Sequence, residues 1–74
     1  MNGTIVRLVA DKGYGFIKGE DGKDYFFHKM EFSGFFEDMV VDVQNGRKVL
    51  VKFESVHSDK GPRASDVIRT DGGI

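Results

Sequence analysis

Alternating apolar and polar positions predict a chain made of short β-strands. In residues 48–54 every second position is apolar, namely Val49, Val51 and Phe53, while the positions between them, Leu50 included, face mostly water. This pattern is the clearest in the chain and predicts a strand that is buried on one side. A first strand is predicted over residues 4–9 because they include β-branched side chains, although their alternation is imperfect.

A last strand is predicted over Ala64–Thr70, after a polar loop at Ser55–Lys60. Pro62 has no backbone N–H for a ladder hydrogen bond, so it belongs at the start or the edge of a strand. Simple alternation places Ala64 and Val67 on opposite faces of this last strand.

Two aromatic segments predict a β-hairpin. Residues 12–17 read Lys-Gly-Tyr-Gly-Phe-Ile, residues 24–28 read Asp-Tyr-Phe-Phe-His, and a polar turn that contains glycine separates them. With a period of two, Tyr14 and Phe16 share one face of the first strand. Phe26 and His28 share one face of the second strand. Folding the hairpin back brings these four flat side chains together on one surface.

The other face of this hairpin is predicted to be core, with Ile17, Tyr25 and Phe27 pointing inward. Gly13 and Gly15 lie on that same face of the first strand. Glycine weakens a strand interior, so its presence indicates a close approach of another backbone or a sharply coiled strand, as in a small barrel.

The middle of the chain predicts little regular structure. Lys29–Phe32 is expected to form one turn of 3₁₀ helix, with Met30 and Phe32 capping the end of the barrel. Residues 34–38 are expected to form a loop. Residues 40–43 have β-propensity and precede an Asn-Gly turn sequence, so a short extra strand is expected there, and no helix longer than a turn.

The two aromatic motifs resemble those of the cold shock domain family. Lys-Gly-Tyr-Gly-Phe-Ile at 12–17, preceded by Asp11, is similar to the family's first ribonucleoprotein motif, and Tyr-Phe-Phe-His at 25–28 is similar to its second. Gly61-Pro62-Arg63-Ala64 followed by Val67 resembles the family's last strand. The resemblance runs from about Gly3 to Arg69 and implies an all-β fold, a five-stranded antiparallel barrel of the OB type.

The resemblance also implies binding of single-stranded RNA or DNA, with weak sequence preference such as for pyrimidine runs. An RNA chaperone or a regulator of transcription or translation is the implied cellular role. The expected stacking residues are Tyr14, Phe16, Phe26 and His28. The expected basic residues around them are Arg7, Lys12, Lys18 and Lys29, joined by Lys60 and Arg63 from the last hairpin. The alternative for the rings is a place in the barrel core, and for the lysines ordinary solvation.

Two departures from the family pattern bear on the binding surface. Where the family usually has Lys-Trp-Phe, this chain has Arg7-Leu8-Val9, and Leu8 is expected to take the place of the tryptophan as an apolar patch without a ring. Lys29 stands where the family usually has an aromatic after the histidine. An aromatic in the family's long loop contacts bases, and either Phe35 or Phe36 is expected to do so unless the pair folds onto the barrel.

Composition narrows the function classes. The chain has 74 residues, a formal net charge of −1 and no cysteine, and is expected to form one domain over residues 1–70 with a disordered tail at 71–74. This net charge argues against binding of nucleic acid by bulk charge and favours a local basic patch. No apolar run approaches the roughly 18 residues that a membrane span needs. A cytoplasmic monomer without membrane contact is expected.

The sequence predicts neither catalysis nor a cofactor. It offers no serine–histidine–acid arrangement, no glycine loop that enters a helix and no paired carboxylates in a plausible cleft. No metal site is expected, since only His57 is available to partner His28 and thiolates are lacking. The alternative to nucleic-acid binding is a diverged barrel whose aromatic face binds a protein, or a cold shock domain cut from a longer protein.

Overall fold

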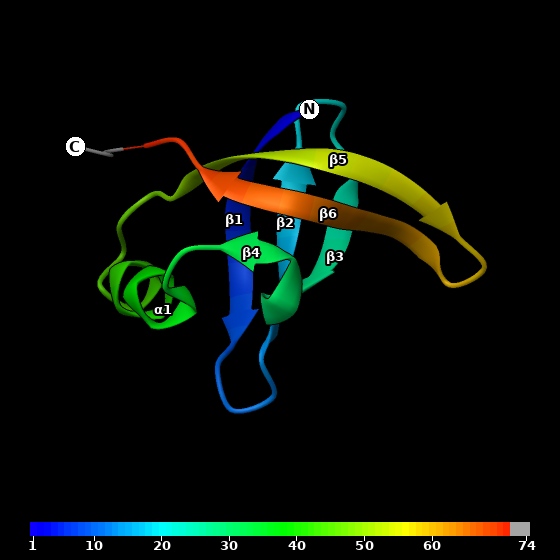
Figure 1. The fold of residues 1–74 in the computed structure, drawn as a ribbon. Helices are drawn as coiled ribbons and strands as arrows, with labels where there is room; N and C mark the ends of the chain where they lie inside the picture. Colours follow the sequence, from blue (N-terminus) through cyan, green and yellow to red (C-terminus); the bar gives the residue numbers. More distant parts are fainter. Residues whose placement is uncertain (72–74) are drawn as a thin grey trace.

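One curved sheet closes on itself into a barrel in the computed structural model, which describes residues 1–71. The strands are β1 (Asn2–Val9), β2 (Tyr14–Gly19), β3 (Asp24–His28), β4 (Phe32–Ser33), β5 (Leu50–Ser58) and β6 (Gly61–Arg69). Their order is β3-β2-β1-β5-β6-β4, and a parallel pairing of β3 with β6 closes the ring. Figure 1 shows the β5–β6 hairpin crossing the layer formed by β1, β2 and β3. The predicted five-stranded OB-type barrel is confirmed, with two-residue β4 added beside β6.

The core fills the barrel interior. Its buried side chains are Ile5, Ile17, Tyr25, Phe27, Phe32, Phe36, Met39, Val49, Val51, Phe53, Ala64 and Val67. The inward face predicted for the aromatic hairpin is confirmed, because Ile17, Tyr25 and Phe27 are all buried. The apolar alternation predicted for residues 48–54 is confirmed too, and it supplies the β5 side of the core.

Irregular positions in β1 and β6 explain why simple alternation failed there. The register of β1 against β2 shifts between Ile5 and Arg7. In β6, Asp66 has φ 50° and the pairing with β5 shifts at this point. An extra residue of this kind turns the following side chains over. Ala64 and Val67 are therefore both buried, so their predicted placement on opposite faces is wrong.

The largest difference from the sequence prediction is a helix, α1 (Phe36–Gln44), where a loop and a short strand were expected. Phe36, Met39, Val40 and Val43 follow the spacing of one helix face, and all four pack on the core. Asn45 and Gly46, with φ 79° at the glycine, end this helix instead of joining two strands. Burial of this apolar face outweighs the β-propensity of the valines.

Two smaller expectations also need correction. The predicted polar loop at 55–60 is mostly strand, because β5 continues to Ser58 before a tight turn. The 3₁₀ turn is present as η1 (Lys29–Glu31), and Phe32 is buried after it. Met30, however, is 83% exposed and does not cap the barrel.

Ion pairs fasten α1 to the end of β6. Arg69 donates hydrogen bonds to Asp42 of α1 and to Asp71, and Arg47 reaches Asp42 at 3.1 Å. The Arg69 guanidinium lowers the pKa of both the Asp42 and the Asp71 carboxyl groups. Asp71 thus has defined contacts, and the rest of the predicted tail, residues 72–74, lies outside the described residues.

Candidate nucleic-acid interface

Three aromatic rings touch one another on the outside of the barrel. The ring centres of Tyr14 and Phe16 are 6.0 Å apart, those of Tyr14 and Phe26 5.3 Å, and those of Phe16 and Phe26 5.8 Å. Cross-strand register explains the cluster, since Phe16 lies opposite Phe26 and Tyr14 lies opposite His28. All four side chains are half-buried, so they are not in the core. We call them the aromatic face.

Glycine beneath the aromatic face lets β1 and β2 approach closely. A Cβ on Gly15 would lie 2.5 Å from Leu8 Cδ2 and 2.8 Å from the carbonyl oxygen of Arg7. No real side chain tolerates such distances, so only glycine fits here. The close backbone contact predicted from the glycine pattern is present.

The same register corrects the placement of Leu8. Leu8 pairs with Gly15, points to the inner side and packs against the core. Arg7 pairs with Phe16, so its exposed side chain lies on the aromatic face. In place of Leu8, the structure therefore brings Arg7, and Val9 opposite Tyr14, to the β1 edge of this surface.

His28 has a fixed orientation. Its Nδ1 accepts a hydrogen bond of 3.2 Å from the backbone N–H of Met30 and so caps η1. With Nδ1 acting as an acceptor, the neutral imidazole carries its proton on Nε2. The ring beside Tyr14 thus offers a flat surface and one outward donor.

Lys29 lies over the turn that leads into β2. Its backbone N–H donates to the carbonyl of Gly13 at 2.8 Å, and its aliphatic carbons cover Gly13, which has φ 71°. Lys12 is exposed in the same turn. Both lysines therefore flank the Tyr14 end of the aromatic face. Lys18, exposed and opposite Asp24, lies at the other end of β2.

The two adjacent phenylalanines at the start of α1 differ in burial. Phe36 is buried against Phe27, with ring centres 6.3 Å apart, so its expected role in base contact is wrong. Phe35 is 76% exposed at the N-cap position. Exposed phenylalanine is unusual because the ring has no polar group.

Residues of the last hairpin form a pocket at the β3–β6 edge of the aromatic face. Arg63 lies opposite Phe26, and its guanidinium carbon is 5.2 Å from the centre of that ring. The pocket has a volume of about 430 Å³ and is lined by Phe16, Phe26, Lys60, Pro62 and Arg63. The expectation that Lys60 and Arg63 lie near the rings is met. Pro62 was missed as a site residue, because the Gly-Pro pair was interpreted only as a strand start.

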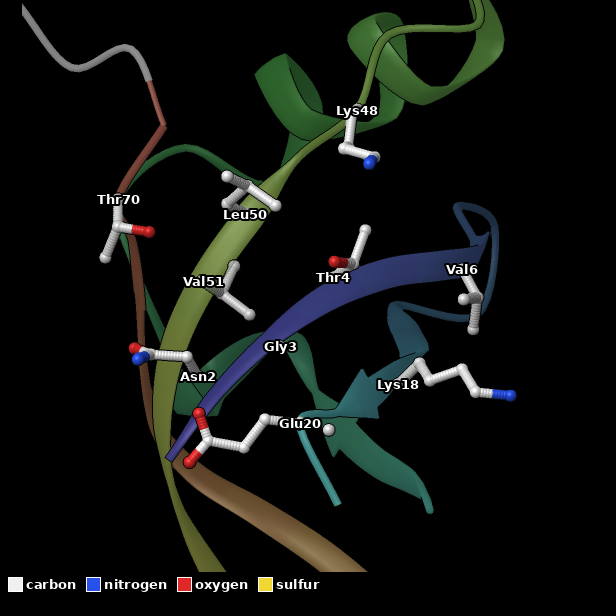
Figure 2. A pocket seen from close by; sticks show the side chains of 11 residues that line it. Asn2, Gly3, Thr4, Val6, Lys18, Glu20, Lys48, Leu50, Val51 and Thr70 are labelled. Atoms are coloured by element: carbon white, nitrogen blue, oxygen red, sulfur yellow. The ribbon is translucent and has the colours of Figure 1, made fainter. Parts of the chain in front are cut away.

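A second, larger groove lies over the first half of β1 and the start of β5 and reaches Lys18 of β2 (Figure 2). Its volume is about 730 Å³, and Thr4, Val6, Leu50 and Val51 are among its lining residues. Lys18, Lys48 and Glu20 give it charges of both signs, and no aromatic side chain lines it. We call it the aliphatic groove.

Residues 1–71 contain no group of three or more metal-ligating side chains. Within the same residues, α1 is too short to cross a membrane and no other helix exceeds a single turn.

The fold and the clustered surface aromatics place this protein in the class of small OB-type β-barrels. Sequence comparison agrees: the model of the 'Cold-shock' DNA-binding domain matches residues 1–70. The chain belongs to the cold shock domain family, and this supports nucleic-acid binding of the cold shock type.

Curated relatives cover nearly all of the chain. Cold shock protein 1 of Lactiplantibacillus plantarum is 46% identical over 67 residues, which are 90% of this chain and 94% of the relative. Cold shock-like protein CspC of Bacillus cereus is 36% identical, with 93% of this chain and 98% of the relative covered. Cold shock protein CspA of Staphylococcus haemolyticus is 37% identical, with 90% and 94% covered.

Proposed function

We propose that this protein binds single-stranded RNA or DNA by stacking splayed bases on its aromatic face. The observation that supports this most strongly is the contact among Tyr14, Phe16 and Phe26 outside the core. A folded domain normally keeps such rings inside, and an exposed apolar patch marks a binding surface. Family membership points to the same ligand class.

Stacking would supply most of the affinity. Each base that stacks on an aromatic side chain contributes roughly 1–3 kcal/mol, and every base has a π-face, so sequence preference from stacking is weak. The exposed basic residues Arg7, Lys12 and Lys29 would lie along the phosphates. With few such contacts, binding depends on salt only moderately.

Phe35 extends this proposal to α1. A ring that is 76% exposed at the first turn of a helix is a candidate for stacking one further base. Phe36 cannot exchange roles with it, because Phe36 holds α1 on the barrel.

The proposed cellular role is that of an RNA chaperone that traps unpaired strands, or a regulator of transcription or translation. The relatives are named cold shock proteins, which supports this role. The protein is proposed to act as a monomer. Trapping works because stacked bases cannot pair at the same time, so the protein shifts the equilibrium away from duplex.

The test is a titration of labelled oligo-dT, oligo-U and a duplex of equal length, followed by fluorescence anisotropy at about 20 mM salt, where charges are least screened. We expect both single strands to bind and the duplex not to bind. Phe16→Ala and Phe26→Ala should each weaken binding by about fivefold or more, because each loses a stacking interaction of roughly 1–3 kcal/mol, while circular dichroism shows an intact barrel. Absence of single-strand binding by the unmodified protein contradicts the proposal and favours a protein partner for the aromatic face.

A further inference from the structure

The pocket at the β3–β6 edge combines a stacking surface with a cation of fixed shape. Phe16 and Pro62 contribute rings to its wall, and Arg63 and Lys60 contribute positive charge. The remainder of the aromatic face offers Tyr14, His28 and separate basic side chains. The pocket therefore has room for one base and a group that can contact the edge of that base.

Arg63 is held where the barrel closes. It lies opposite Phe26 of β3 on one side and opposite Val56 of β5 on the other. The 5.2 Å contact of its guanidinium with the Phe26 ring is a cation–π interaction, which keeps the side chain at the pocket wall. A side chain restricted in this way loses less entropy when it binds a ligand.

The donors of Arg63 are available to a ligand. Among residues 1–71, the ion pairs of arginine involve Arg47 and Arg69, and no carboxylate is paired with Arg63. No side-chain hydrogen bond of Arg63 is formed within this part of the chain either. Its side chain is exposed beside the pocket.

The chemistry of the guanidinium distinguishes among the bases. Arginine presents parallel N–H donors in a rigid plane. Guanine has two adjacent acceptors, O6 and N7, on one edge, whereas adenine has a donor beside N7, and thymine and uracil have no adjacent acceptors. Cytosine has adjacent acceptors in O2 and N3 but a smaller ring for stacking. From this geometry we propose that the pocket selects guanine, with Arg63 donating to O6 and N7. The proposal rests on the proposed function and adds one specific position to an otherwise tolerant surface.

A contact of Arg63 with phosphate is the competing explanation, and lysine substitution separates the two. Lysine keeps the charge but lacks the rigid planar pair of donors, so Arg63→Lys preserves a phosphate contact and weakens guanine selection. Phosphate contact also predicts a shallower salt dependence in Arg63→Gln, whereas a base contact leaves the slope unchanged.

The experiment places a single guanine at each position of a seven-residue oligo-dT in turn. The affinity for each oligonucleotide is compared with the affinity for the one that has adenine at the same position. At the best position we expect the guanine oligonucleotide to bind about tenfold more tightly than its adenine counterpart. Inosine, which keeps O6 and N7, should retain the preference, and 7-deazaguanine, which lacks N7, should lose it. Arg63→Lys should weaken the preference, and Arg63→Gln should lose it. Arg47→Lys, an exposed arginine far from the pocket in sequence and fold, is the matched control and should retain it.

Two results overturn the inference. One is equal binding of guanine and adenine at every position, and the other is a guanine preference that survives in Arg63→Gln. The outcome for oligo-dT separates this failure from failure of the proposed function. If oligo-dT binding depends on Phe16 while guanine has no effect, only the guanine pocket is wrong. If no oligonucleotide binds, both proposals are wrong.

Discussion

The aromatic face and the aliphatic groove are both open to solvent. The aliphatic groove is larger than the pocket on the aromatic face, yet it is the poorer candidate for the binding site. The groove has about 730 Å³ and the pocket beside the rings about 430 Å³. The pocket offers Phe16, Phe26 and Pro62 as flat walls and two cations. The groove offers aliphatic and small polar side chains with charges of mixed sign. Chemistry of the walls, rather than volume, indicates which surface takes a base.

The aliphatic groove is explained by packing. A Cβ on Gly3, in its wall, would lie 2.5 Å from Cγ2 of Ile17 in the core. Thr70, at its edge, donates its backbone N–H to Leu50 at 2.8 Å and lies directly after Arg69, which fastens α1. The close contact at Gly3 and the backbone hydrogen bond of Thr70 hold the strands together around the groove, whose lining side chains are shown in Figure 2. Under the proposed function, the aromatic face would bind nucleic acid, while the residues around the aliphatic groove stabilise the barrel.

The strongest test of this division removes two rings at once. In the double variant Tyr14→Ala, Phe16→Ala, two stacking interactions of roughly 1–3 kcal/mol each are lost, so affinity for oligo-dT should fall by about thirtyfold or more. The double variant Val6→Ala, Leu50→Ala in the aliphatic groove is the matched control, and its affinity should stay within about twofold. A larger loss in the control than in the ring variant would reverse the assignment of the two regions.

The adjacent phenylalanines test where the binding surface ends. Phe36→Ala deletes a buried ring from the core, so its free energy of unfolding should fall by about 3–5 kcal/mol in urea denaturation. Phe35→Ala should change stability by no more than about 0.5 kcal/mol. If Phe35 stacks a base, the same variant should lose roughly 1–3 kcal/mol of binding free energy. Unchanged affinity would confine the binding surface to the sheet.

Much of the aromatic face could be predicted because a strand period of two assigns faces directly. Tyr14, Phe16, Phe26 and His28 follow from the two motifs and their hairpin alone. Faces were predicted wrongly in β1 and β6, where a shift in strand register interrupts the two-residue alternation of side chains. The shift in β1 decides that Arg7, and not Leu8, lies on the aromatic face, and no sequence pattern marked that shift.

The helix was missed for a different reason. Phe36, Met39 and Val43 have helical spacing, yet the intervening valines have β-propensity and the segment is short. The choice between helix and strand depends on packing of this apolar face against the open end of the barrel, which the local sequence does not show. The pocket at Arg63 likewise depends on the closure of β3 against β6, a contact between segments far apart in sequence.

Salt dependence gives a finer comparison of the same two regions. If about three phosphates are contacted, a plot of log affinity against log salt should have a slope near −2 for a single strand. Neutralising Arg7 or Lys29 with glutamine should make that slope shallower by about 0.7. Lys48→Gln, which removes a cation from the aliphatic groove, should leave it unchanged. A changed slope in Lys48→Gln would show that the bound strand continues into the groove.

The smallest expected effect is the loss of stability at low pH that comes from the ion pair between Asp42 and Arg69. The Arg69 guanidinium lowers the pKa of the Asp42 carboxyl group in the folded protein. A carboxyl group with a lowered folded pKa contributes stability that is fully present above its unfolded pKa of about 3.9 and is lost as pH falls through the folded pKa. The urea concentration at the unfolding midpoint should therefore decrease when the pH is lowered below about 4. In Asp42→Asn the midpoint should already be lower at pH 7, and it should decrease less on acidification.

The control for this prediction is Asp59→Asn, which neutralises an exposed carboxylate in the β5–β6 turn that has no ion pair within residues 1–71. It should keep the full acid dependence. At pH 7, Asp42→Asn should still bind oligo-dT as the unmodified protein does, because Arg69 and Asp42 act on α1 and not on the rings. An equal fall with acid in Asp42→Asn and Asp59→Asn would show that the ion pair does not hold the helix. Lost affinity in folded Asp42→Asn would show instead that α1 and the aromatic face are coupled, so binding and stability would share one structural unit.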